Sequence, residues 1–389
     1  MELRILVHHR PPAGQGPVLQ VRELVRALRA LGSRVEETAT AGRHEVETHP
    51  AADAAGLSLV QLVPRFGREI LEHATSRLGE SRVLAAATRL DPHFIYERYA
   101  PADMAGVRVR DRLRLPLFLE VDAPLVCELE RLGKLIFRRW ARRVERQVLG
   151  RADLIFAVSG VLKRVLVAQG IPGEVILVQH NAVDPDRFAH PPSREEVQAE
   201  LGLQGRFVIG LSGFIRNRNR AELVLQAMAT LLGEGARETH LLLVGEGPGV
   251  AFLRRRAQKL GMEGRLTVTG RVPRARLPHL LAAFDAAVVP AAGPYASPLE
   301  LFAYLGASIP VVVPDQENLR EVVTRGETAL TFTPGDPSSL AAALAELIED
   351  PGVGARLGAA GHRVVEGEGR NWRANARRVV RAYAERFAG

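Results

Sequence analysis

Arginines are concentrated after one glycine in the second half of the sequence. Gly213 follows the apolar run Phe207–Leu211, and Arg216 and Arg218 come shortly before a helical pattern that begins near Ala221. Guanidinium groups bind phosphate oxygens through paired hydrogen bonds, and a helix start adds partial positive charge. We therefore expect Gly213, Arg216 and Arg218 to hold a phosphate-bearing ligand. A solvated loop is the alternative, because the 52 basic residues of the chain include only three lysines.

The segment from Ser297 to Glu300 has the pattern of a helix start. Serine is a favourable N-cap, Pro298 suits the first helical turn, and Glu300 completes a capping box. The first N–H groups of a helix have no partner within it and attract anions. The backbone from Ser297 through Leu299 is therefore predicted to hold a diphosphate.

A glycine loop also follows the first predicted strand, Arg4–His9. Gly14 and Gly16 could open a dinucleotide-binding turn, but Leu19 occupies the third glycine position. This argues against a hydride-transferring enzyme. We expect instead that the backbone at Gly16 approaches an anionic ligand at a helix N-terminus.

Metal-binding signals are weak. Asp184 and Asp186 form a D-x-D pattern, but they lie in a proline-containing stretch that is typical of a turn. No His, Asp and Glu cluster has metal-ligand spacing, so we predict no metal site. His8 and His9 end the first strand, where structural or solvent-facing roles are the more common ones.

Composition limits the class of protein. A length of 389 residues predicts two or three domains, and 47% apolar residues allow a sizeable core. No apolar run approaches the length that spans a bilayer, the first residues do not resemble a signal peptide, and the single cysteine, Cys127, fits the cytoplasm. The net charge of +8 favours anionic partners, but no aromatic-rich basic platform indicates nucleic acid.

One basic stretch, Arg131 to Arg151, has a helical pattern with two interpretations. It would contact an acidic membrane surface peripherally through the helix Arg138–Arg146, or it would pack its apolar stripe on a sheet as an ordinary surface helix, which we favour. The stretch combines Arg138, Arg139, Arg142, Arg143 and Arg146 with Leu135, Ile136, Trp140, Val144 and Val148.

Strand and helix patterns alternate along the chain, which predicts an α/β protein with parallel sheets. The pattern restarts near residue 206, after the proline-rich stretch 184–200. We predict two Rossmann-like doubly wound domains facing a cleft, 1–190 with 371–389 and 191–370. The predicted strands are Arg4–His9, Ser33–Glu37, Phe94–Tyr99, Pro116–Val121, Leu154–Ser159, Val175–Gln179, Phe207–Leu211, Leu241–Val244, Leu266–Thr269, Ala286–Pro290, Pro310–Val313 and Ala329–Phe332.

Several motifs together resemble glycosyltransferase family 4, whose members are retaining enzymes of the GT-B fold that use nucleotide-sugars. The resemblance covers nearly the whole chain. It rests on Ser297–Gly306 with the following Ile309–Val312 and Leu319–Val322, on Tyr96–Tyr99, Leu119–Pro124, Asn181–Asp184, Val244–Pro248 and Thr269–Pro273, and on a last helix from Trp372 to Phe387 that in this fold crosses back onto the first domain.

The resemblance implies metal-independent transfer of a sugar from a nucleotide-sugar to an acceptor, with no cofactor. It places Asp122 and Glu300 among the catalytic groups and Gln20 and Arg98 on the acceptor side. Asp122 is equally well explained as a turn aspartate. The donor would be held by Gly16, Gly213, Arg216, Arg218, Gly270, Val272, Ser297, Pro298 and Leu299.

The chain departs from the family pattern at the donor site. Tyr295 and Ala303 stand where the family has two glutamates, and Glu300 stands where a close relative pattern has lysine. An acidic group at the helix start competes with a diphosphate for the same N–H groups. The alternative function is therefore a catalytically impaired homologue that acts as a binding or partner subunit.

Overall fold

The computed structural model describes residues 2–10, 16–39, 65–216, 220–233, 238–367 and 369–387. The chain divides into two compact units, the first formed by residues 1–179 and 375–389 and the second by residues 180–374. The predicted boundary lies at 190, whereas the second unit already begins at residue 180, since Asn181 and Val183 form hydrogen bonds within it.

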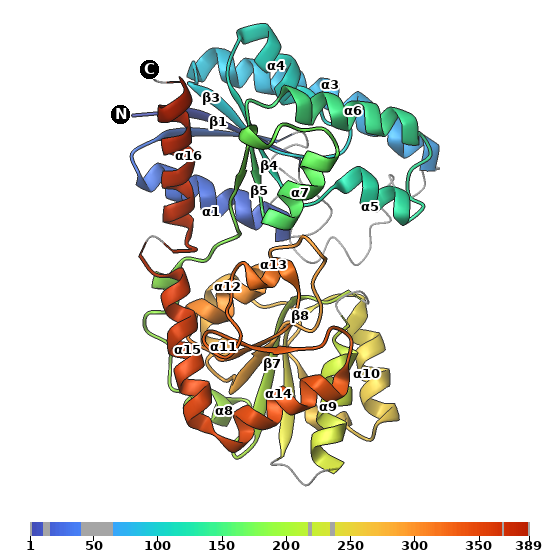
Figure 1. Ribbon diagram of the computed structural model, residues 1–389, viewed down its shortest axis with the longest axis vertical. Coiled ribbons are helices and arrows are strands. Elements are labelled where there is room, and N and C mark those ends of the chain that lie inside the picture. Colours follow the sequence, from blue (N-terminus) through green and yellow to red (C-terminus); the bar gives the residue numbers. More distant parts are fainter. Residues whose placement is uncertain are drawn as a thin grey trace. The chain divides into compact units, whose positions relative to one another are not determined.

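The first unit is a parallel sheet with strand order β2-β1-β3-β4-β5-β6, with helices around it (Figure 1). Its strands are β1 (Arg4–His9), β2 (Arg34–Ala39), β3 (Phe94–Arg98), β4 (Leu117–Val121), β5 (Leu154–Ala157) and β6 (Ile176–Val178). Its helices are α1 (Gly16–Ala30), α3 (Arg65–Leu90), α4 (Ala105–Leu113), α5 (Leu125–Arg131), α6 (Arg138–Arg151) and α7 (Gly160–Ala168).

The last helix of the chain, α16 (Trp372–Phe387), begins in the second unit and ends in the first. Within the first unit, the ring of Tyr383 stacks on that of Phe94 with 5.2 Å between centroids, and Phe387 packs on Phe118 at 5.8 Å. These aromatic contacts bury the apolar face of α16 on the sheet.

The second unit is a parallel sheet with strand order β12-β11-β10-β7-β8-β9. Its strands are β7 (Phe207–Phe214), β8 (Thr239–Glu246), β9 (Leu266–Val268), β10 (Ala286–Val288), β11 (Val311–Pro314) and β12 (Leu330–Phe332). Its helices are α8 (Arg194–Glu200), α9 (Glu222–Gly233), α10 (Gly249–Lys259), α11 (Leu277–Leu281), α12 (Leu299–Gly306), α13 (Glu317–Arg320), α14 (Pro337–Glu349) and α15 (Pro351–Val365).

Alternate strand residues enter different apolar clusters of the second unit. Ile209 and Leu243 belong to one cluster, whereas Val208 and Leu242 belong to another that includes residues of α12. A sheet buried on both faces needs apolar residues at successive positions, which is why short apolar runs predicted these strands. The fold is the predicted pair of doubly wound parallel sheets, and every predicted strand is present.

The basic stretch from Arg131 to Arg151 is not one continuous helix, because α5 ends at Arg131 and α6 begins at Arg138, and α6 contains the predicted helix Arg138–Arg146. Gly133 has φ +63°, and the N–H groups of Gly133 and Lys134 donate to the carbonyls of Glu130 and Leu129. This is a Schellman helix end, which a glycine in the left-handed region favours. Within the described residues no helix is long and apolar enough to cross a bilayer.

Candidate functional site

Both sheets reverse their strand order once, and ligands of doubly wound sheets bind at the carboxyl ends of the strands at that point. The reversal lies between β1 and β3 in the first unit and between β7 and β10 in the second. Residues predicted to act in binding or chemistry lie at both places. Each unit therefore has a candidate site of its own.

In the first unit, Arg98 brings the predicted acceptor-side residues together. Its guanidinium contacts the carboxylate of Asp122 and the side-chain oxygen of Gln20, and it lies 2.8 Å from Oε1 of Glu120. Arg98 and Glu120 are partners in the register of β3 and β4, so their side chains share one face of the sheet. Gln20 comes from α1, and Asp122 directly follows β4. We name these four residues the Arg98 cluster.

One carboxylate oxygen of this cluster has no donor. Oδ1 of Asp122 is buried and accepts no hydrogen bond among the described residues, whereas Oδ2 pairs with Arg98. Glu120 is satisfied by Arg98 and by the hydroxyl of Tyr96 at 2.7 Å. Because a buried acceptor without a donor is unfavourable, Asp122 is suited to receive a hydrogen bond from a ligand hydroxyl.

His9 adds a neutral group near the Arg98 cluster. Burial, followed by the charges of His8, Arg98 and Arg22, lowers the pKa of His9 to about 4. At neutral pH the imidazole is therefore uncharged. It does not add to the positive charge of Arg98.

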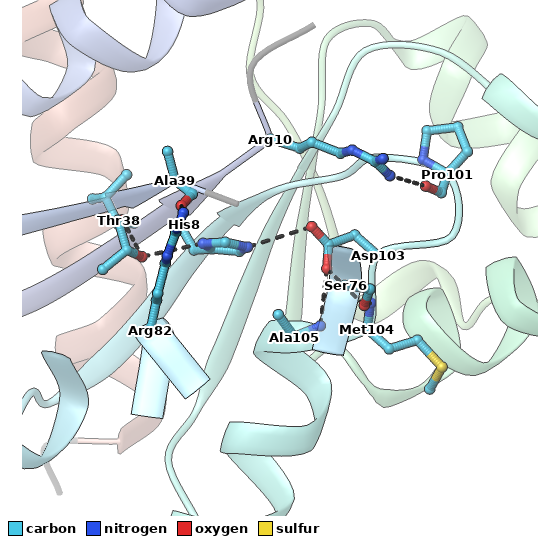
Figure 2. Close-up of polar contacts among 11 residues, drawn as sticks. His8, Arg10, Thr38, Ala39, Ser76, Arg82, Pro101, Asp103, Met104 and Ala105 are labelled. Carbon is cyan, nitrogen blue, oxygen red and sulfur yellow. Dashed lines mark hydrogen bonds and ion pairs between the residues drawn. The ribbon is translucent and has the colours of Figure 1, made fainter. Parts of the chain in front are cut away.

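A second polar group in the first unit surrounds His8 (Figure 2). The His8 ring lies 3.4 Å from Asp103 through Nε2 and 3.1 Å from the hydroxyl of Thr38 through Nδ1. Asp103 accepts hydrogen bonds from the backbone N–H of Ala105 and from the hydroxyl of Ser76. Asp103, which precedes the N-cap residue Met104, thus accepts from the first N–H of α4, and the group connects β1, β2, α3 and α4 as a structural unit.

Glu97 lies close to this group and was not singled out from the sequence. Its side chain is 1% exposed and lies against Gly106, where a Cβ would meet Oε2 at 1.8 Å. Burial and the charge of Asp103 raise the pKa of Glu97 to about 8, although His8 and the N–H of Gly106 act in the opposite direction. In the sequence, Glu97 was one residue of the family motif Tyr96–Tyr99, and only the structure shows that its side chain is buried.

In the second unit, the end of β7 is open at the predicted phosphate-binding glycine. Gly213 has φ +115°, and a Cβ built there would meet no atom within 4 Å. The Arg216 guanidinium lies 4.8 Å from the centroid of the Phe214 ring, a cation–π contact that holds it near this end of the strand. Arg218, predicted with Arg216, lies outside the described residues.

The glycines after β8 explain how the β7 end is packed. A Cβ at Gly245 would lie 1.9 Å from the carbonyl oxygen of Gly213, and one at Gly247 would lie 2.2 Å from that of Ile215. Only residues without a side chain allow this approach of two backbones. The loop 245–249 therefore fixes the course of the chain at Gly213 and Ile215.

Helix α12 begins differently from the prediction. Ser297 is not its N-cap: the N-cap position is Pro298, and no side chain caps the helix. The Ser297 hydroxyl instead accepts a hydrogen bond of 3.0 Å from the backbone N–H of Asn181, whose side chain donates to the Ser297 carbonyl at 2.5 Å. The predicted capping box with Glu300 is therefore wrong, and the residue at the N-cap position, Pro298, makes no side-chain hydrogen bond to the helix.

Glu300 and Tyr304 lie one turn apart on α12. Burial raises the pKa of Glu300, opposed by its own backbone N–H. Burial also raises the pKa of Tyr304, and the charge of Glu300 adds to that effect. The Tyr304 hydroxyl accepts a hydrogen bond of 2.7 Å from the backbone N–H of Ser212, at the end of β7. Glu300 therefore belongs to the same region as Gly213.

The remaining predicted positions lie at loops or helix ends. Gly270 follows β9 with φ +72°, and half-buried Val272 packs on the apolar cluster that includes α12. Gly16 is the first residue of α1. Asp184 precedes a short 3-10 turn and lies 3.5 Å from Arg187, as a turn residue would. Among the described residues, no three His, Cys, Asp or Glu side chains are placed to hold a metal ion.

Family models match both halves of the chain. The model described as Glycosyltransferase Family 4 matches residues 15–187, and the model described as Glycosyl transferases group 1 matches residues 193–364. Together they reach from α1 to α15. The two matches meet near the boundary between the two units.

Relatives and solved structures agree with these models. The chain is 31% identical over 54% of its length to a 2-deoxystreptamine glucosyltransferase of Streptomyces kanamyceticus, and 28% identical over 57% to a GDP-mannose-dependent phosphatidylinositol monomannoside mannosyltransferase of Mycolicibacterium smegmatis. The matches span 54% and 59% of these relatives' own lengths. HepE of Anabaena, solved with UDP and glucose, superposes with TM-score 0.73 at 18% identity over 98% of this chain and 99% of its own.

Proposed function

Because the chain belongs to glycosyltransferase family 4 and has the GT-B fold, we propose that it transfers a sugar from a nucleotide-sugar donor to an acceptor hydroxyl. The observation that carries this proposal is the donor-side geometry of the second unit. The open backbone at Gly213, the guanidinium of Arg216 and the N-terminus of α12, whose N-cap residue Pro298 makes no capping hydrogen bond, lie at the strand-order reversal of one sheet. Such an arrangement suits a diphosphate.

We infer that the transfer retains the configuration of the sugar. The bond from the sugar carbon to the donor phosphate oxygen breaks, a bond to the acceptor oxygen forms on the same face, and the acceptor proton passes to the departing phosphate. No separate base is then needed. Asp122 would orient the acceptor hydroxyl through its unpaired Oδ1, while Arg98 pairs with Oδ2 and holds the carboxylate in place.

The charge of the departing diphosphate would be met by Arg216 and the N-terminus of α12 rather than by a metal ion. Metal independence is part of the proposal, and transfer should persist in excess EDTA. The nucleotide is left open, since HepE was solved with UDP whereas the mycobacterial relative is named for GDP-mannose. We also propose the cytoplasm as the compartment, on the basis of the single exposed cysteine.

A second function, a catalytically impaired subunit that binds a partner, is favoured by one observation. Ala303 occupies the position where the family has a ribose-binding glutamate, and its methyl group packs on the core. Ala303 therefore offers no polar atom to a ribose. If this loss has abolished donor binding, the chain would keep the fold and have no transfer activity.

Calorimetric titration of the purified protein with UDP, GDP and ADP separates the two functions. Micromolar binding of one nucleotide supports the transferase. Arg216→Ala should then weaken binding about tenfold or more, because a charged hydrogen bond contributes roughly 1.5–3 kcal/mol. Arg255→Ala, an exposed change on α10, is the matched control. Absence of binding to all three nucleotides would contradict the donor site and leave the partner function.

A further inference from the structure

Large apolar side chains are exposed between α5 and α6 of the first unit. Of the nine large hydrophobic residues that are clearly exposed in the described chain, four lie between positions 132 and 140. They are Leu132, Ile136, Phe137 and Trp140, with 61%, 49%, 43% and 38% of their surface exposed. An exposed apolar patch of this kind is typical of an interaction surface.

The local structure explains why these side chains face outward. The glycine-ended helix α5 stops at Arg131, so Leu132, Ile136 and Phe137 lie in a connection that is not part of a helix. Helix α6 packs on the first unit through Ala141, Val144 and Val148, which leaves Trp140 on its outer side. The predicted packing of an apolar stripe is confirmed for α6, whose Ala141, Val144 and Val148 are buried, and a separate exposed apolar set precedes that stripe.

The charge around this patch is strongly positive at the surface. All seven basic residues between 131 and 146 are exposed, whereas Glu130 is half-buried and Glu145 is buried. Glu130 is paired with Arg142 through two contacts of 2.7 Å, and Glu145 accepts from the hydroxyl of Tyr99. Arg138, Arg139 and Arg143 are exposed and have no salt bridge within 4 Å among the described residues, although the charge of Arg138 contributes to the lowered pKa of Glu130.

We propose that residues 131–146 form a docking surface for a bilayer with anionic headgroups. Apolar and aromatic tips enter the headgroup region, and the surrounding arginines and lysine pair with lipid phosphates. Each basic residue near such a surface raises the affinity about fivefold. A second copy of this chain fits less well, because the same basic surface would face itself. The inference does not depend on sugar transfer.

The tryptophans allow a direct test with the full chain. The sequence holds two: Trp140 is exposed, and Trp372 is 7% exposed. In a Trp372→Phe variant, the emission reports Trp140 alone. With vesicles of phosphatidylglycerol and phosphatidylcholine in equal parts, we expect a blue shift and quenching by brominated lipid tails, and with pure phosphatidylcholine at least tenfold weaker binding.

Variants with the same net charge distinguish binding through this surface from binding through the overall positive charge of the chain. Arg138→Glu with Arg139→Glu should reduce co-sedimentation with anionic vesicles at least tenfold, and Phe137→Ser should also reduce it. Arg254→Glu with Arg255→Glu on α10 makes the same net change at another exposed site, and Phe252→Ser is the matched apolar control. Thermal unfolding of each variant checks that it folds.

Three results would overturn the proposal. The first is no binding of the wild-type chain to anionic vesicles, and the second is an equal loss in the α10 controls, which would reduce the effect to net charge. The third is a concentration-dependent dimer that the Phe137→Ser change dissociates, which would assign the patch to a second copy. We expect nucleotide binding to be unchanged in all of these variants, so the membrane proposal and the donor-site proposal can fail independently of each other.

Discussion

The hydroxyl of Tyr304, in the middle of α12, lies 2.7 Å from the backbone nitrogen of Ser212 and 3.1 Å from its hydroxyl. This pair fixes the end of β7 against the helix whose N-terminus is proposed to hold the diphosphate. The residue after Ser212 is Gly213, so a shift at Ser212 moves the open backbone of the donor side. Tyr304 thus positions the donor side at Gly213 through its hydrogen bond with Ser212.

Tyr304→Phe should therefore affect stability and nucleotide binding together. Removal of the hydroxyl leaves the Ser212 N–H without its acceptor, which costs about 1–3 kcal/mol of unfolding free energy. Denaturant titration measures this cost, and calorimetry with the best-bound nucleotide should show weaker affinity. Tyr383→Phe is the control, because Tyr383 contributes ring stacking in the first unit. Equal changes in the two variants would contradict the positioning role.

Glu300 should make donor binding depend on pH. Its pKa is raised by burial, so a falling pH protonates it before an ordinary glutamate and removes the negative charge beside the α12 N-terminus. Affinity for a nucleotide-sugar should increase as the pH falls through this raised pKa and decrease above it. A nucleotide-sugar is the right probe because its diphosphate does not titrate near neutral pH.

Glu300→Gln removes the charge at every pH. At pH 8 it should bind the donor several-fold more tightly than the wild type, since one repulsion within the site is worth about 1 kcal/mol or more at moderate screening. Its affinity should change little between pH 5 and pH 8. Glu349→Gln, on the exposed end of α14, is the control. Weaker binding by Glu300→Gln would indicate that the carboxylate itself contacts the donor.

Asp122→Asn tests the acceptor side. The amide keeps the shape of the side chain but loses the charge that faces Arg98. We expect the rate of transfer to fall about tenfold or more. Nucleotide affinity should stay within about twofold, because the Arg98 cluster belongs to the first unit and the predicted diphosphate-binding residues belong to the second. Asp91→Asn, which removes a surface pair with Arg4, is the control. Full activity would make Asp122 an ordinary turn residue.

The sequence predicted the strands well because burial on both faces of a parallel sheet leaves a local signal. β7 and β8 are longer than predicted, since Gly213 and Gly245 continue the pairing without side chains. Composition cannot show such an approach between two backbones. Arg98 and Gly213 lie where the strand order of their sheets reverses, and this position could be assigned only once the order of the strands was known.

Partners distant in sequence explain most of what could not be predicted. Ser297 has the local pattern of an N-cap, but Asn181, 116 positions away, takes its hydroxyl. Arg98 and Asp122 were both predicted at the carboxyl ends of strands on the acceptor side, but only the structure shows that their side chains form an ion pair. Glu97 gives no sign of its burial in the sequence, because its surroundings come from His8, Asp103 and α4.

Burial of Glu97 should make the stability of the protein depend on pH. Its pKa is about 8 in the folded chain and near its ordinary value of 4.5 when unfolded. The folded state therefore holds the proton more tightly, so this stabilisation is complete below about pH 4.5 and is lost as the pH rises to about 8. The loss is on the order of 4 kcal/mol. The raised pKa of His8 acts in the same direction.

Glu97→Gln should flatten this dependence, because an amide carries no charge to desolvate. Unfolding free energies from urea titrations at pH 5, 6.5 and 8 should fall steeply for the wild type and much less for the variant, which becomes the more stable form at pH 8. Glu349→Gln should keep the wild-type slope. A variant that retains the wild-type slope would contradict the raised pKa of Glu97 in the folded protein.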